Sequence, residues 1–271
     1  MKVTSRKSVS VLAAASTAAL FAPLGSVNAQ VSADAPVVFQ AAGPNGASIQ
    51  STVDEFRTAL GGDNNASNPG PLTEGRREIN WDGLGSTATS VVPTPFGGFQ
   101  LTRGALFTTP GDGFVQAPVS GIAETFGNPT YETIFQPFSP VRLFSAVGST
   151  VTNSLFFVPG SADQHATVRG FGAVFTDVDR PDGGAGGVRG GSTLVQCFGR
   201  DGTLLFSDFV PSSPGKAGVS FLGVVFRDAR ISRVRIRAGN VIPGADDGGT
   251  QDVVMMDDFI YGEPQAVHQQ Q

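Results

Sequence analysis

The stretch that decides the fold class is Gly218-Val-Ser-Phe-Leu-Gly-Val-Val-Phe226. Successive side chains of a strand point to opposite sides of its sheet. Phe221 and Val225 therefore fall on one face, and Leu222 and Val224 fall on the other. A short run that is apolar on both faces is typical of a strand that is covered from both sides. We expect this strand to lie in the middle of a sheet between two packed layers.

Short runs that alternate with a period of two surround this stretch, and turns rich in Gly and Pro separate them. They span residues 76–82, 99–107, 133–138, 151–158, 167–177, 193–198, 203–209, 231–237 and 253–261. Arg200-Asp-Gly202 is a hairpin signal between two of these runs. The 36 Gly, 18 Pro and 21 Phe also favour many short strands. The sequence therefore predicts an all-β fold, a jelly-roll-like β-sandwich spanning residues 71–264.

The first residues predict an export signal. Lys2, Arg6 and Lys7 precede an Ala-rich apolar run, and Val27-Asn-Ala29 has the small or aliphatic residues of a signal-peptidase site. The apolar run is shorter than the ~20 residues needed to cross a bilayer. We expect a signal peptide at residues 1–29, no membrane-spanning segment, and a secreted or periplasmic protein.

The predicted leader, residues 30–70, contains one short amphipathic N-terminal helix. Its apolar side chains recur on one stripe at helical spacing, and they are Ile49, Val53, Phe56 and Leu60. Ser48 can cap the start of the helix, and Gly61-Gly62 ends it. At the other end of the chain, residues 265–271 predict a disordered tail.

Charge and cysteine content argue against several classes of protein. Removal of the signal's three positive charges takes the net charge from −5 to about −8, which disfavours nucleic acid as a partner. Cys197 is the only cysteine, so no intrachain disulfide can form. One Cys and two His argue against the usual zinc sites. His165 is the single histidine of the predicted domain, and no nucleophile-elbow motif accompanies it.

A pair of carboxylates lies in the predicted strand Val253-Val-Met-Met-Asp-Asp-Phe-Ile-Tyr261. Neighbours in a strand face opposite ways, so we expect Asp257 and Asp258 on opposite faces. A buried carboxylate needs compensation from an Arg, from backbone N–H groups or from a cation such as Ca²⁺. Two interpretations stay open: one Asp is exposed and the other pairs with an Arg, or the two ligate calcium.

A second acidic face is predicted in the strand that begins at Arg76, where Glu78, Asn80 and Asp82 alternate. A jelly roll that brings its first and last strands together would place this face near Asp257 or Asp258. Oxygen ligands without histidine are the set that Ca²⁺ prefers. The alternative is a solvated polar face on an edge strand.

A third acidic segment is Asp177-Val-Asp-Arg-Pro-Asp-Gly183. It has carboxylates at alternate positions and a turn glycine, but it lacks the spacing and the bidentate Glu of an EF-hand loop. We expect an acidic turn that leads into the Gly-rich loop 183–191.

Candidate ligand-binding residues are basic or aromatic. Arg233, Arg235 and Arg237 alternate with Val234 and Ile236, so the three guanidinium groups line one strand face. They suit an anionic polysaccharide, but a solvated face or one paired with acidic residues of neighbouring strands is the commoner outcome for such a row. The aromatic candidates for stacking on a sugar are Trp81, Tyr131 and Tyr261. Trp81 shares its strand face with Ile79, however, and this arrangement favours a place in the core.

The last third of the chain carries several short motifs in a recurring order. They are Gly170-Phe-Gly-Ala-Val-Phe-Thr-Asp-Val-Asp179, Gly202, Phe221-Leu-Gly-Val-Val-Phe226, Ile231-Ser-Arg-Val-Arg-Ile236 and Met256-Asp-Asp-Phe-Ile-Tyr-Gly262. In this order they resemble bacterial secreted jelly-roll domains, including the PEP-CTERM-type proteins with a C-terminal sorting anchor. This chain ends in a polar tail without that anchor, so we expect free release or periplasmic residence. The resemblance implies a jelly-roll fold, of a kind that frequently binds carbohydrate and calcium, with Asp257 and Asp258 as a ligand position.

Three hypotheses about function follow. The first, which we favour, is a non-catalytic secreted protein that binds a polysaccharide or cell-envelope component and holds a structural Ca²⁺. The second is a secreted hydrolase or lyase that acts on a polysaccharide with paired carboxylates, although no spacing selects a catalytic pair. The third is a structural envelope or matrix protein. Fold alone does not choose among them.

Overall fold

The computed structural model describes residues 35–85, 87–179, 192–213 and 215–267. The predicted signal peptide, residues 1–29, and the Gly-rich loop 183–191 lie outside these ranges. The strands are β1 (Val37–Gly43), β2 (Arg76–Ile79), β3 (Ser90–Pro93), β4 (Phe96–Phe99), β5 (Ala105–Thr108), β6 (Gly113–Pro118), β7 (Arg142–Val147), β8 (Val151–Phe156), β9 (Ala166–Thr167), β10 (Gly170–Thr176), β11 (Leu194–Phe198), β12 (Leu204–Phe209), β13 (Val219–Val225), β14 (Arg233–Arg237), β15 (Met255–Gly262) and β16 (Gln265–Ala266). The helices are α1 (Gly46–Leu60), α2 (Gln100–Arg103), α3 (Val119–Phe126) and α4 (Tyr131–Ile134), with a 3-10 turn at Asp82–Leu84. None of these helices is long and apolar enough to cross a membrane.

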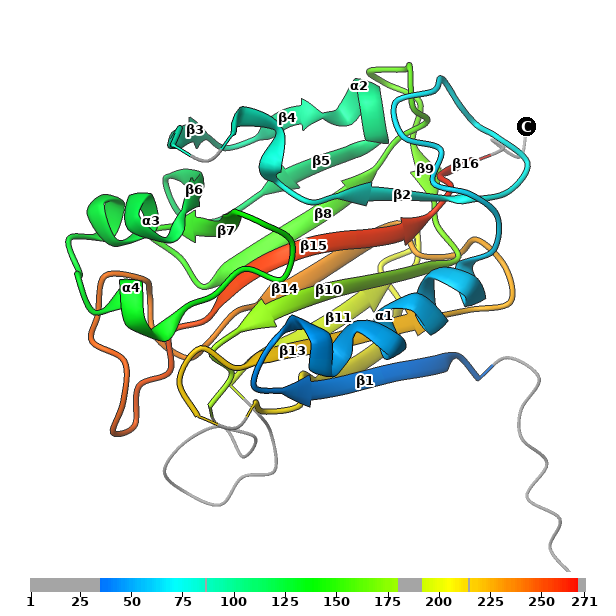
Figure 1. Ribbon diagram of the computed structural model, residues 1–271. Helices are drawn as coiled ribbons and strands as arrows, with labels where there is room; N and C mark the ends of the chain where they lie inside the picture. The colour runs from blue at the N-terminus through cyan, green and yellow to red at the C-terminus, as the bar shows by residue number, and fades with distance from the viewer. Residues whose placement is uncertain (1–34, 86, 180–191, 214, 268–271) are drawn as a thin grey trace, which may run out of the picture. The chain divides into compact units, whose positions relative to one another are not determined.

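The described strands form two large antiparallel sheets and one small pair. The first sheet has the order β1-β13-β10-β15-β7-β6-β3, and β2 also pairs with β15. The second sheet has the order β12-β11-β14-β8-β5-β4 (Figure 1). β9 and β16 form the small pair. The fold is therefore mostly antiparallel β-sheet and sandwich-like, as the alternating pattern predicts.

The main core lies between the two large sheets and contains apolar side chains from both. The first sheet contributes Phe171, Phe175, Leu222, Val224, Met256 and Phe259, and the second contributes Phe107, Phe156, Val195, Cys197, Val234 and Ile236. The 218–226 strand becomes β13, whose seven residues are all buried. Its other face is covered by α1, so both of its faces pack against protein.

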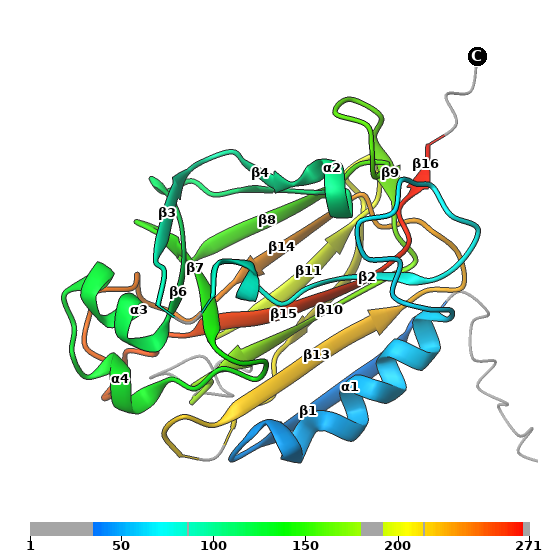
Figure 2. The same cartoon turned by 45° about the horizontal axis from the view of Figure 1, so that its top comes forward.

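α1 covers the outer face of the first sheet. Asn45 caps its N-terminus, because its Oδ1 accepts a hydrogen bond from the Ser48 N–H at 3.2 Å. Its buried side chains are Ile49, Val53, Phe56 and Leu60, and they pack on Val174, Val219, Phe221, Val225 and Ile260. The helix lies along β13 in both views of the molecule (Figures 1 and 2).

A smaller apolar cluster lies where α3 and α4 cover β6 and β7. It contains Val115, Ala117, Ile122, Tyr131, Ile134, Phe135, Leu143, Val253 and Met255. The loop between β14 and β15 joins this cluster through Val253. That contact brings the loop next to α4, and it positions the site described below.

Several sequence expectations differ from the structure. Residues 99–107 are divided by α2, whose end has Gly104 at φ 74°, a left-handed conformation that favours glycine. Residues 133–138 were expected to be a strand, but they begin in α4 and continue as a loop. β3, β6, β7 and α3 were not predicted. Gln265–Ala266, expected in the disordered tail, pair with β9.

β15 has two partners along one edge. Near its start Met256 pairs with Phe144 of β7, and from Phe259 onward β15 pairs with β2. Its end is tied to β2 by a buried ion pair in which the Arg77 Nε and the Glu263 Oε2 lie 2.6 Å apart. Between the two partners the edge of β15 faces the chain segments around Asn80 and Ser139.

Candidate functional site

Asp257 and Asp258 lie at a β-bulge in β15. On the neighbouring strand β10, Ala173 lies opposite Phe259, but Val174 lies opposite Asp257, so Asp258 is an extra residue in the ladder. The bulge resets the alternation, and both carboxylates reach Ser139. The expectation that they face opposite ways is therefore wrong, because that expectation assumed an unbroken pleat.

Groups of the chain itself compensate both aspartates. The Asp257 Oδ2 accepts hydrogen bonds from the backbone N–H groups of Phe138 at 2.6 Å and Ser139 at 3.2 Å. The Ser139 hydroxyl donates to the Asp258 Oδ1 at 2.6 Å, and the Arg57 Nη2 lies 3.6 Å from the Asp258 Oδ2. Burial raises the pKa of both carboxyls, and the charge of Asp258 raises that of Asp257 further. The pair serves to fasten residues 138–139 to β15.

Glu78, Asn80 and Asp82, the second acidic face predicted from the sequence, lie near Asp257 and Asp258. Their side chains, however, form hydrogen bonds and ion pairs with other groups of the chain. β2 ends at Ile79, and Trp81 has a left-handed φ of 65°, so the expected alternation stops before Asp82. Glu78 forms an ion pair with Arg57, with the Arg57 Nη2 and the Glu78 Oε2 2.9 Å apart. The Asp82 Oδ1 accepts hydrogen bonds from the N–H groups of residues 141 and 142. The Asn80 side chain donates to the Asp82 Oδ2 at 3.1 Å.

The three predicted stacking aromatics are buried, which corrects their assignment as ligand-binding residues. Trp81 stacks on Phe144, with 3.8 Å between the ring centroids. The Tyr261 hydroxyl donates to the Arg103 carbonyl at 3.0 Å, and Tyr131 belongs to the cluster under α3. Each side chain is at most 1% exposed, so a sugar cannot stack on it.

Another group of carboxylates comes together where β10 ends. Oxygen atoms of Asp177, Asp179 and Asp247 all lie within 4.8 Å of one another, and we call these three residues the aspartate cluster. Asp177 is buried, Asp247 is half-buried and Asp179 is exposed, so the cluster reaches from the protein interior to its surface. Three convergent carboxylates without nitrogen or sulfur donors suit a hard cation. These residues could therefore hold a metal ion.

Two buried carboxyls at this place lack hydrogen bonds. Among the described residues, neither oxygen of Asp177 nor of Asp252 has a hydrogen-bond partner, and both residues are 0% exposed. The Ala217 N–H lies near Asp177, and the Ser192 hydroxyl and the Asp179 N–H lie near Asp252; all three favour the charged forms without meeting the geometry of a hydrogen bond to these oxygens. An unsatisfied buried carboxylate is costly, so a native one requires an explanation.

Burial and mutual repulsion raise the pKa values of these carboxyls. Burial, followed by the charges of Asp179, Asp247 and Asp252, raises the pKa of Asp177 to about 8. Burial, opposed by Ser192 and assisted by the charge of Asp247, raises the pKa of Asp252 to about 6. Among the described residues, the charges that act on these two carboxyls are those of other carboxylates. A divalent cation would supply the opposite charge.

The loop between β14 and β15 is held in place by Tyr131. The Tyr131 hydroxyl donates to the carbonyl of Ala245 and accepts from the Gly244 N–H, each at 2.8 Å. The Asp247 Oδ1 accepts from the Val253 N–H at 3.0 Å. These contacts place Asp247 opposite Asp177, although 69 positions of sequence separate the two residues.

Sequence reasoning identified only half of this site. It singled out Asp177 and Asp179 but missed Asp247 and Asp252. The signal available was the segment Asp246-Asp-Gly-Gly-Thr-Gln-Asp252, in which carboxylates flank two turn glycines. The sequence alone does not show that β10 and β15 are neighbours, and this pairing is what brings the segment beside the end of β10.

The three predicted arginines share the outer face of the second sheet. On β14, Arg235 and Arg237 are exposed and Arg233 is half-buried, whereas Val234 and Ile236 between them belong to the core. Arg233 lies over the ring of Phe198, 4.2 Å from its centroid. The Arg237 Nε donates to the Ser192 carbonyl at 3.3 Å.

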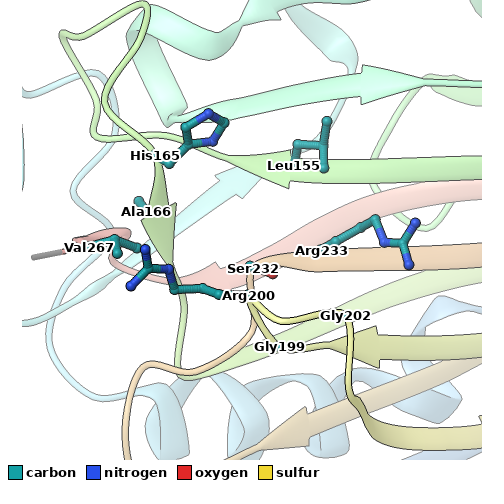
Figure 3. A pocket seen from close by; sticks show the side chains of 9 residues that line it. All are labelled: Leu155, His165, Ala166, Gly199, Arg200, Gly202, Ser232, Arg233 and Val267. Carbon is teal, nitrogen blue, oxygen red and sulfur yellow. The ribbon is translucent and has the colours of Figure 1, made fainter. Parts of the chain in front are cut away.

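A cleft of about 550 Å³ lies at the Arg233 end of this row. Its lining comes from β8, β9, the β11–β12 turn, the start of β14 and the residue after β16 (Figure 3). The lining residues are Leu155, His165, Ala166, Gly199, Arg200, Gly202, Ser232, Arg233 and Val267. Two of them are arginines and none is acidic.

The chain matches no protein-family model, no curated protein and no solved structure.

Proposed function

We propose that this chain is a non-catalytic, secreted β-sandwich protein that binds Ca²⁺ at the aspartate cluster and has a polysaccharide as its partner. One observation carries the metal proposal: in the described part of the chain the buried carboxylate of Asp177 has no hydrogen-bond partner, and one of its oxygens lies within 4.8 Å of oxygens from two further carboxylates. Export is supported by the charged and apolar pattern of residues 1–29. The jelly-roll connectivity stays a prediction from the resemblance.

Calcium fits the donor set better than a transition metal does. Ca²⁺ takes six to eight oxygen ligands in flexible geometry, whereas the softer metals favour histidine and cysteine. The cluster offers carboxylate oxygens from Asp177, Asp179 and Asp247, with the buried carboxyl of Asp252 adding further negative charge nearby. Water can complete the coordination on the side where Asp179 is exposed.

The hydrolase hypothesis receives less support. It needs two carboxyls with free oxygens that face a substrate. The Asp257 and Asp258 oxygens instead accept hydrogen bonds from residues 138 and 139, and both side chains are buried. The raised pKa values of the pair follow from that burial.

Thermal unfolding of the purified protein in Ca²⁺ and in EDTA tests the metal proposal. A ligand present at about 100 times its Kd stabilises the folded state by ~2.7 kcal/mol. For a chain of this size that corresponds to a rise of roughly 5–10 °C in Tm. We expect Ca²⁺ to produce such a rise, and EDTA to remove it.

Three variants locate the ion. Asp247→Asn should abolish the rise in Tm, because it removes one cluster carboxylate. The matched control is Asp246→Asn, which removes the neighbouring exposed carboxylate and should keep the rise. Asp258→Asn should also keep it. Loss of the rise in Asp258→Asn with retention in Asp247→Asn would move the ion to the bulge, and an unchanged Tm in the native protein would refute calcium binding.

A further inference from the structure

On the outer face of the second sheet, the described strands beside β14 place no acidic residue directly opposite its arginines. Arg233 lies between Phe198 and Leu155 of the adjacent strands, and Arg235 lies between Gln196 and Asn153. The flanking positions of Arg237 are Leu194 and Val151. No carboxylate therefore faces the three guanidinium groups from either neighbouring strand.

The arginines of this face are available for a ligand. Within the described ranges, Arg200, Arg233 and Arg235 make no ion pair, and the one polar contact of Arg237 is with a backbone carbonyl. Three acidic side chains around this face accept hydrogen bonds from other groups. Asp163, which lines an adjoining hollow with His165 and Arg200, accepts one from the Ser161 hydroxyl at 2.9 Å. Asp201 accepts hydrogen bonds from the N–H and hydroxyl of Thr203, and Asp208, at the sheet edge, accepts one from Gln40.

We infer that this face and its cleft bind a polysaccharide that carries carboxylate groups, such as a polyuronate. This inference rests on the proposed polysaccharide-binding function and deepens it by naming the ligand class and the site. A guanidinium group matches a carboxylate in a two-point hydrogen-bonded geometry. Alternate residues of a strand lie about 6.6 Å apart, so the arginines of β14 present a repeating row to a repeating polyanion.

The remaining lining suits a sugar rather than a bare anion. Leu155, Ala166 and Val267 supply apolar contact in the cleft, while Ser232 and His165 supply hydrogen-bonding groups. The cleft volume of about 550 Å³ lies within the ~300–1,000 Å³ of small-molecule sites. A sugar ring has apolar C–H faces, hydroxyl groups and, in a uronate, one carboxylate, and the cleft offers a partner for each.

The charge of the whole chain argues for a sparsely charged polymer over nucleic acid. The net charge is −5, so a dense polyanion would be repelled by most of the surface. A row of arginines on one face can still attract a polymer with one carboxylate for each sugar.

The test is isothermal titration of the full protein with polygalacturonate, and with dextran and double-stranded DNA as comparison polymers. We expect binding to polygalacturonate alone, with an affinity that falls as salt is added. The double variant Arg233→Gln/Arg235→Gln should weaken that binding at least tenfold. The matched control is Arg227→Gln, an exposed arginine after β13, which should change the affinity less than twofold.

Each other outcome is decisive. Equal loss in the control and in the double variant would show non-specific attraction and overturn the assignment of the site. Binding to dextran but not to polygalacturonate would refute the acidic ligand while leaving polysaccharide binding intact. Binding to DNA in preference to polygalacturonate would overturn the ligand class. Binding to no polymer would overturn both the inference and the polysaccharide partner, but not the calcium proposal, which the Tm measurement tests separately.

Discussion

Asp177 combines three properties at the scale of a single residue. Its backbone has a left-handed φ of 66°, its side chain is fully buried, and its carboxyl oxygens lack hydrogen bonds. Left-handed backbone in a residue other than glycine is uncommon, although Asp and Asn tolerate it best. Strain and burial of this kind persist when the surrounding structure holds the residue in place.

The raised pKa of Asp177 predicts how stability depends on pH without metal. Above about pH 4 the unfolded carboxyl loses its proton, but the folded one keeps it until about pH 8. The folded state then binds more protons, so stability falls as pH rises through this window. We expect the Tm in EDTA to fall between pH 4 and pH 8, and the rise caused by Ca²⁺ to grow over the same range.

Asp177→Asn is the control for this prediction. Asparagine keeps the shape and tolerates the left-handed backbone, but it does not titrate. Its Tm in EDTA should fall less steeply with pH than that of the native protein, and its response to Ca²⁺ should be lost. A Tm in EDTA that rises between pH 4 and pH 8 in the native protein would contradict the raised pKa.

For Asp257, Asp258 and Trp81, the partners that the side chains need were easier to predict than the direction in which the side chains point. The sequence correctly required compensation for Asp257 and Asp258, and an Arg and backbone N–H groups provide it. The sequence pattern predicted the two carboxylates on opposite faces, because a β-bulge cannot be recognised from an alternating pattern of residues. Trp81 was assigned both to the core and to a ligand site, and only its 1% exposure decides for the core.

At the scale of elements, α4 and the loop before β15 form one support for the aspartate cluster. The Tyr131 ring is buried under α3, while its hydroxyl bonds to residues 244 and 245. The helix therefore holds the loop that carries Asp247.

Tyr131→Phe tests this support. The phenyl ring keeps the packing, and loss of the two hydrogen bonds should lower stability by about 1–3 kcal/mol. Because the loop is then less well held, we expect Ca²⁺ affinity in calorimetry to fall several-fold. Tyr261→Phe is the matched control, since it removes another buried tyrosine hydroxyl far from the loop and should leave the affinity unchanged. Equal affinities in the two variants would show that Tyr131 does not position the site.

The elements that the sequence predicted least well are short or adjoin turns. β13 and β14 were clear because seven and five residues alternate or stay apolar without interruption. β3 has four residues, and β6 runs directly into α3 at Pro118 and Val119, so neither has enough residues for a distinct period. Residues 99–107 are likewise too short on either side of α2 and Gly104 to show a period of their own.

At the scale of the whole molecule, the described chain separates its charges. Carboxylates gather at the aspartate cluster and at the bulge of β15, whereas the outer face of the second sheet carries arginines. Composition gave only the net charge. The separation depends on which strands are neighbours, and strand order could not be derived from alternation.

Trp81 reports on the unfolding of both sheets at once, because it is the only tryptophan and contacts Phe107 of β5 and Phe144 of β7. Thermal curves from its fluorescence and from far-UV circular dichroism should coincide, and Ca²⁺ should shift both equally. The curves of Asp247→Asn should also coincide but not move with Ca²⁺. Two separate midpoints in the native protein would mean that the sheets melt independently.

The late position of β15 in the chain has a consequence for how the protein acquires its fold. This strand separates β10 from β2 and β7, so the centre of the first sheet stays open until residue 262 is available. If the chain is exported from its N-terminus, as proposed, it therefore cannot complete the first sheet until β15 has crossed. The chain would remain unfolded during transport, because folds with long-range β pairing form slowly. Under the proposed export, the first sheet would be completed only on the far side of the membrane.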